Sequence, residues 1–119
     1  MRAAWLALVI GLAASPPASA LEDLHVLIGS VQDSAAIIDA GLRLGDVREI
    51  KDEGLRLSRV GAAIIDHGVT ECVQAFSALL NATNDVATPM TPRLLVALER
   101  DLAAYNEWMP QCERIAFGR

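Results

Sequence analysis

Two histidines and a methionine are the side chains of this 119-residue chain that could hold a metal ion or a haem. His25 and His67 could bind zinc or copper through imidazole nitrogens, and the thioether of Met109 would favour reduced copper. An imidazole and a thioether on opposite sides of a helical core could also ligate haem iron. No ligand-spacing motif joins the three residues, and each also has an ordinary structural role. A metal or haem site at these positions is therefore the alternative hypothesis.

Cys72 and Cys112 are the two cysteines of the chain. They form no Cys-x-x-Cys motif, which argues against thiol-redox chemistry, covalent haem attachment and a cysteine-based zinc site. In an exported protein, an even pair of cysteines most simply forms one disulfide. The interpretation of the pair therefore depends on the compartment, and the compartment depends on the N-terminus.

An export signal is predicted over residues 1–20. A basic residue precedes the apolar run 3–14, two prolines follow, and Ala18-Ser19-Ala20 offers the small side chains that a signal peptidase accepts. The run is shorter than the roughly 18 to 20 residues that cross a bilayer. We expect cleavage after Ala20, a mature domain of residues 21–119 without a membrane span, and a periplasmic or secreted location in which the disulfide is stable.

Catalytic and nucleic-acid-binding patterns are missing from the sequence. It contains no Gly-x-Ser-x-Gly, no His-Glu-x-x-His and no glycine-rich phosphate loop. The adjacent carboxylates Asp52 and Glu53 point to different faces of a helix, so we expect a solvated surface rather than a catalytic pair. The formal net charge of -5 repels phosphate backbones, and no basic run offsets it. We predict a protein that is not an enzyme and does not bind nucleic acid.

Apolar residues at alternating steps of three and four predict helices and no strand. The first helix is expected over residues 22–44 and ends at Gly45. The second begins at the capping box Asp46-Val-Arg-Glu49, in which each side chain would accept from the other residue's backbone N–H, and it ends at Gly68. Gly54 and Gly61 lie inside this helix, where they indicate close helix packing or room for a flat ligand such as a porphyrin.

Two more helices follow the same spacing. Thr70 is expected to cap the third, and Thr91-Pro92 supplies a cap and a proline at the first position of the fourth. Pro110 should kink or break the fourth helix just before Cys112. Both cysteines lie on the apolar stripes of their helices, so both should face the core.

Short connections between successive helices favour antiparallel neighbours. The sequence therefore predicts an all-α fold, an antiparallel up-down-up-down four-helix bundle stapled by one disulfide. This topology places Cys72, at the start of the third helix, beside Cys112, near the end of the fourth. It also brings His25 close to His67 at the same end of the bundle.

The leading functional hypothesis is a non-enzymatic interaction protein that binds, inhibits or chaperones another exported or envelope protein. Trp108 is the large aromatic side chain that could anchor such a contact, although it could equally cover the core beside the disulfide. The alternative, a small carrier of copper, zinc or haem, requires a stoichiometric ligand that is lost when His25 or His67 is changed to alanine. An interaction protein should tolerate both changes.

Overall fold

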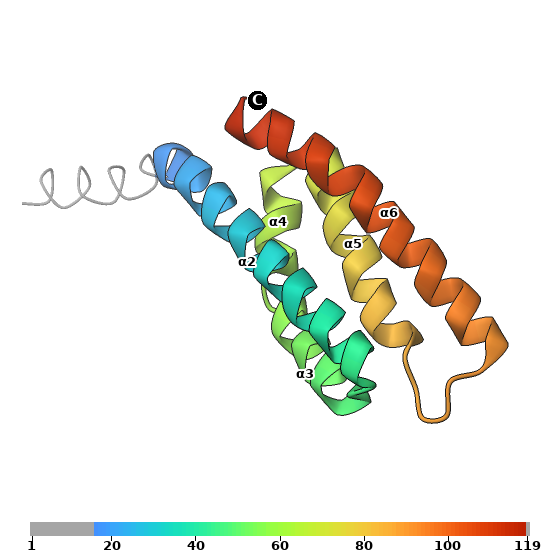
Figure 1. Ribbon diagram of the computed structural model, residues 1–119. Helices are drawn as coiled ribbons and strands as arrows, with labels where there is room; N and C mark the ends of the chain where they lie inside the picture. The colour runs from blue at the N-terminus through green and yellow to red at the C-terminus, as the bar shows by residue number, and fades with distance from the viewer. Residues whose placement is uncertain (1–15, 119) are drawn as a thin grey trace, which may run out of the picture.

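The computed structural model describes residues 16–118, and side-chain surroundings from Leu24 onward. This part of the chain is all-α, without a strand, and its helices are α2 Pro16–Leu44, α3 Val47–Ser58, α4 Gly61–His67, α5 Thr70–Asp85 and α6 Pro92–Phe117 (Figure 1). Residues 1–15 lie outside the described part, so the signal peptide over residues 1–20 stays a prediction. Among the described helices, none combines the length and apolar character needed to cross a membrane.

The turn between α2 and α3 closes with two backbone hydrogen bonds. Gly45 has a φ of 68°, its N–H donates to the Leu42 carbonyl at 3.3 Å, and the Asp46 N–H donates to the Gly41 carbonyl at 2.9 Å. This is the Schellman arrangement that ends many helices at a left-handed glycine. The Asp46 side chain then caps α3 by accepting from the Glu49 N–H at 3.1 Å. The second hydrogen bond of the predicted capping box, from the Asp46 N–H to the Glu49 carboxylate, does not form, because the Asp46 N–H donates to the Gly41 carbonyl.

The expected second helix is divided into α3 and α4, which corrects the sequence prediction. The Ser58 hydroxyl donates to the Leu55 carbonyl at 2.7 Å, and in a continuous helix that carbonyl would accept from the Arg59 N–H. The Arg59 N–H instead donates to the Arg56 carbonyl at 3.2 Å, and a tight turn follows before α4 begins at Gly61. A local side-chain hydrogen bond therefore accounts for the break.

The start of α5 also differs from the prediction. Val69, in an extended conformation, is the N-cap residue and Thr70 is the first helical residue, so Thr70 does not cap the helix. Gly68, with a φ of 71°, ends α4 as expected. Only two residues, Gly68 and Val69, therefore separate the end of α4 from the start of α5.

The start of α6 is as predicted, but its interior is not. The Thr91 hydroxyl accepts from the Leu94 N–H at 3.2 Å, which confirms the predicted cap. Pro110 does not break the helix, which continues to Phe117. The proline is exposed, so the helical carbonyl that it leaves without a partner lies on the solvent side. In the same turn the Gln111 side-chain amide donates to the Glu107 carbonyl at 3.2 Å.

The pairing of α5 with α6 is the most extensive contact between helices, and Figure 1 shows them side by side. The predicted disulfide joins Cys72 near the start of α5 to Cys112 near the end of α6, with 4.6 Å between Cα atoms. Helices α2 and α3 pack together, α3 packs on α5, and α2 also contacts α6. The core between them consists mainly of aliphatic side chains, and the largest that are almost completely buried are Ile28, Val31, Ile38, Ile50, Leu57, Ile64 and Leu79.

The interior glycines of the second predicted helix allow close approach of α5. A Cβ at Gly54 would lie 2.5 Å from Oγ1 of Thr83, and one at Gly61 would lie 2.7 Å from the ring of Phe76. A hollow of about 360 Å³ lies beside Gly54 between α3 and α5, but side chains of α5 lie directly against both glycines. This favours the packing explanation over room for a flat ligand.

The disulfide should contribute a large share of the stability. Replacing Cys72 and Cys112 together with serine opens a loop whose ends are 40 residues apart. We expect the free energy of unfolding to fall by about 4 kcal/mol, because the unfolded chain gains the entropy of an open loop. Urea denaturation followed by circular dichroism measures the change. Reduced wild-type protein should match the variant, and an unchanged midpoint would contradict the prediction.

Two glycine substitutions should have opposite effects on stability. Gly54→Ala should lower the free energy of unfolding by about 1 to 3 kcal/mol, because Thr83 donates its hydroxyl to the Leu80 carbonyl at 2.7 Å and cannot move away freely. Gly29→Ala in α2 is the matched control, because no atom lies within 4 Å of its added Cβ. It should raise stability by up to about 1 kcal/mol through helix propensity. Stabilisation by both changes would show that α3 and α5 do not approach this closely.

Candidate functional site

His25 connects α2 to the end of α6. Its Nε2 lies 2.9 Å from the Ala116 carbonyl oxygen, and its ring centroid lies 4.4 Å from that of Phe117. Because a carbonyl oxygen only accepts, Nε2 carries the proton in this contact. The imidazole is exposed, but one of its two nitrogens is already used by the protein.

The other two candidate ligands occupy structural positions. His67 is the last residue of α4 and is half-buried, while Met109 is buried in the core. In the described part of the chain, no group of three or more histidine, cysteine, aspartate and glutamate side chains could hold a metal ion. The copper, zinc or haem site at His25, His67 and Met109 therefore stays a prediction. No cluster of histidine, cysteine, aspartate and glutamate side chains in the described residues supports it.

Trp108 is half-buried and packs against the core one residue before Met109. The indole therefore has part of its surface in the protein and part in solvent. That position suits both roles that the sequence allowed, covering the core beside the disulfide and contacting a partner.

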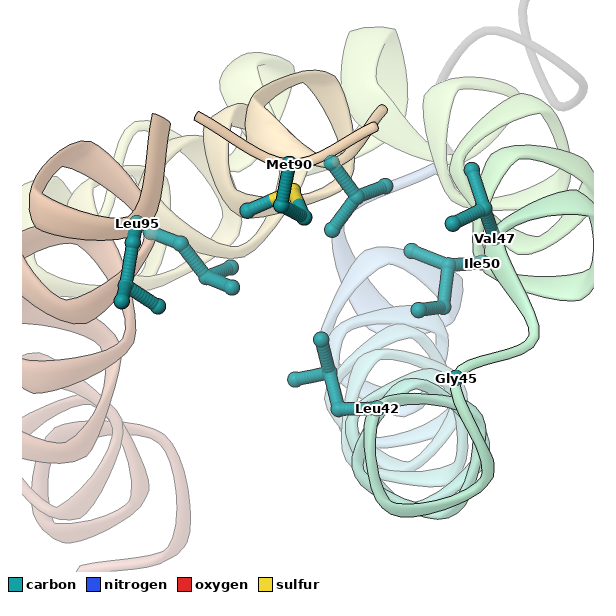
Figure 2. A pocket seen from close by; sticks show the side chains of 8 residues that line it. Leu42, Gly45, Val47, Ile50, Met90 and Leu95 are labelled. Atoms are coloured by element: carbon teal, nitrogen blue, oxygen red, sulfur yellow. The ribbon is translucent and has the colours of Figure 1, made fainter. Parts of the chain in front are cut away.

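An apolar pocket lies at the other end of the molecule, away from the disulfide. It has a volume of about 210 Å³. Figure 2 shows Met90 and Leu95 facing Leu42, Val47 and Ile50 across it. Gly45 lies at its edge, and the complete lining is Leu42, Gly45, Val47, Ile50, Val86, Met90, Leu95 and Leu98. Met90 and Leu95 are 39% and 49% exposed, so apolar side chains form its mouth as well as its walls.

A second hollow of about 190 Å³ lies between α2, α5 and α6. It shares Leu42 with the first pocket, so the two follow one seam between α2 and α6. Its lining is Ala35, Asp39, Leu42, Leu79, Leu102, Tyr105 and Asn106. Burial raises the pKa of Tyr105 to about 12, and the negative charge of Glu113 adds to the shift. The phenol therefore stays neutral and can donate a hydrogen bond at physiological pH.

Glu53 is buried, which corrects the expectation that Asp52 and Glu53 are both solvated. Its side chain is 4% exposed, it accepts from the Ser34 hydroxyl at 2.7 Å and from Arg56 Nε at 2.8 Å, and it thereby joins α3 to α2. The carboxylate raises the pKa of the Arg56 guanidinium through this hydrogen bond and through its charge. Asp52 is exposed, as expected.

Two carboxyl groups, of Asp85 and Asp101, lie near each other where the end of α5 meets α6. Asp101 is buried and accepts from Arg100 Nε and Nη2 at 3.2 and 3.3 Å. Asp85, the last residue of α5, has a buried Oδ2 to which no protein group donates. Burial, together with a hydrogen bond to Asp101 and the negative charge of Asp101, raises the pKa of Asp85 to about 6. Burial also opposes ionisation of Asp101, but hydrogen bonds with Asp85 and Arg100 outweigh it, so the pKa of Asp101 is lowered.

The pocket and the carboxyl pair were not predicted from the sequence. A weak signal existed for Glu53, because Ile50, Glu53, Gly54 and Leu57 follow the helical spacing of one buried face. The segment of turn-forming residues before Pro92 gave no indication that Met90 would line a pocket. Asp85 and Asp101 are 16 positions apart, so only the pairing of α5 with α6 brings them together.

No protein-family model, curated protein or solved structure matches the chain.

Removing the buried glutamate should destabilise the protein. We expect Glu53→Ala to lower the free energy of unfolding by about 2 kcal/mol, because the Ser34 hydroxyl loses its partner while the mostly exposed Arg56 can be hydrated. Asp52→Ala, one position earlier on the exposed face, should change it by less than about 0.5 kcal/mol. Chemical denaturation of both variants measures the difference. Equal effects would show that Glu53 is not buried in solution.

Proposed function

We propose that this protein is a small exported, non-enzymatic interaction protein, and that an apolar segment of another exported or envelope protein docks in the seam between α2 and α6. The observation that carries this proposal is the apolar pocket with its exposed mouth at Met90 and Leu95. Large apolar side chains at the rim of a hollow are typical of protein interaction sites.

The size of the hollows supports side chains as the occupants. Pockets for cofactors and drug-sized ligands usually measure about 300 to 1,000 Å³, which exceeds both hollows of the seam. A third hollow, of about 360 Å³, lies outside the seam between α3 and α5. Because the two hollows adjoin at Leu42, a partner helix or extended segment could place one apolar side chain in each. Asp39, Tyr105 and Asn106 beside the second hollow offer hydrogen bonds to polar groups of the same segment.

The proposed architecture is an antiparallel four-helix bundle in which α3 and α4 together form the second, interrupted helix. Its support is that contacts follow the chain order from α2 to α6, and that α2 also contacts α6. In Figure 1 α4 and α5 appear between the two long helices α2 and α6, and α3 lies against the C-terminal half of α2. The seam would then be the junction of the first and last helices of the bundle.

Export is supported by the disulfide, because such bonds persist in oxidising compartments. The signal predicted over residues 1–20 agrees with this. Cleavage after Ala20 would leave the described core from Leu24 onward in the mature protein.

A photo-crosslinking pair tests the docking site. A photoreactive amino acid in place of Leu95 should give a crosslinked partner in cells that export the protein, whereas the same residue in place of Val96 should not. Both positions are exposed on α6, at 49% and 68%, but only Leu95 lines the pocket. With the partner identified, Leu95→Asp should weaken binding at least about tenfold and Val96→Asp less than about twofold. Equal crosslinking at both positions, or at neither, would contradict the proposed site.

A further inference from the structure

The carboxyl pair at the end of α5 contains an unsatisfied atom. Oδ2 of Asp85 is buried and no protein group donates to it, while Asp101 on the adjacent helix is an acceptor already bonded to Arg100. Two acceptors cannot bond to each other unless one carries a proton. A proton on Asp85 would supply the donor that this buried contact lacks.

The surroundings favour that proton on Asp85 rather than on Asp101. Asp85 is the last residue of α5, where the partial negative charge of the helix C-terminus opposes a carboxylate. Asp101 is held in its ionised form by the guanidinium of Arg100. The charged groups that face Asp85 are Asp101 and Arg100 from α6 and, from α3, Lys51, whose ammonium donates to the Asn84 carbonyl at 3.4 Å.

We propose that Asp85 and Asp101 form a proton-dependent latch that ties the end of α5 to α6 and holds together the adjacent walls of the apolar pocket. With the proton present, Asp85 donates to Asp101 and the two helices are joined. Without it, the carboxylates of Asp85 and Asp101 are both charged and repel each other. The raised pKa of Asp85, about 6, agrees with this assignment.

The latch connects directly to the pocket walls. Val86 follows Asp85 in sequence, Leu98 lies one helical turn before Asp101, and both line the pocket. Loss of the proton should therefore separate these two walls and admit a partner more readily. The consequence for docking rests on the proposed function, whereas the latch itself does not.

The pH dependence follows from the raised pKa. Asp85 binds its proton more tightly in the folded protein, at a pKa of about 6, than in the unfolded chain, whose value is close to 3.8. The stabilisation is therefore complete below about pH 4 and is lost as pH rises through about 6. A shift of about two units corresponds to a change on the order of 100-fold in the folding equilibrium constant.

Asp85→Asn tests the latch, because its side-chain amide donates to Asp101 at every pH. We expect the ratio of the variant's folding constant to that of the wild type to rise on the order of 100-fold between pH 4 and pH 7, as measured by urea denaturation. Asp33→Asn, at an exposed position on α2, removes the same charge and should show a pH-independent ratio. A pH-independent ratio for Asp85→Asn would overturn the latch.

Carbon-13 NMR of the wild-type protein gives a second test. The Asp85 carboxyl should titrate near pH 6, and the methyl resonances of Val86 and Leu98 should move with the same midpoint. Asp101→Asn, which places a donor opposite Asp85, should lower that midpoint toward 4. A wild-type midpoint near 4, or Val86 and Leu98 methyls that do not follow Asp85, would overturn the proposal. If the titration is as expected but Leu95 gives no crosslink, the docking proposal fails and the latch stands.

Discussion

The pairing of α5 with α6 organises this molecule, and its two ends are held by different chemistry. The disulfide between Cys72 and Cys112 joins the helices covalently at one end. At the other end the helices meet through Asp85 and Asp101, whose contact depends on a proton. A covalent bond restricts local opening more than a contact between two acids does, so α6 should separate from α5 first at the end that carries the carboxyl pair.

The two ends of the seam between α2 and α6 also differ. At the disulfide end, His25 donates to Ala116 and stacks near Phe117, which ties α2 to the last turn of α6. At the opposite end, Leu42 and Leu95 face each other across a pocket instead. His25, a candidate metal ligand, therefore lies at the end where α2 and α6 are in direct contact. The two hollows lie toward the opposite end, where α2 and α6 are separated by the pocket. This distribution favours docking of apolar side chains over ligand binding at the histidines.

Local patterns predicted the local structure well. The apolar periodicity identified the buried faces of the helices, and the caps at Asp46 and Thr91 and the glycine end at Gly45 follow from residues a few positions apart. The break between α3 and α4 was not predicted, because a serine at position 58 is compatible both with a continuous helix and with a hydrogen bond to a preceding carbonyl. Burial of Glu53 depends on Ser34, which lies 19 positions away. The pocket arises from spacing between helices, which no local pattern encodes.

The buried polar groups explain why Asp85 should be functional rather than structural. Glu53 accepts hydrogen bonds from Ser34 and Arg56, and Thr83 donates to its own helix, so their burial is compensated. Such compensated groups can fix which helix faces meet, where aliphatic stripes alone would allow several alignments. Asp85 lacks a donor for its buried oxygen unless it binds a proton, and an uncompensated carboxyl group lowers stability at neutral pH. A neutral side chain at this position would avoid that cost at every pH, so the carboxyl group has a physical advantage only if the response to pH is itself useful.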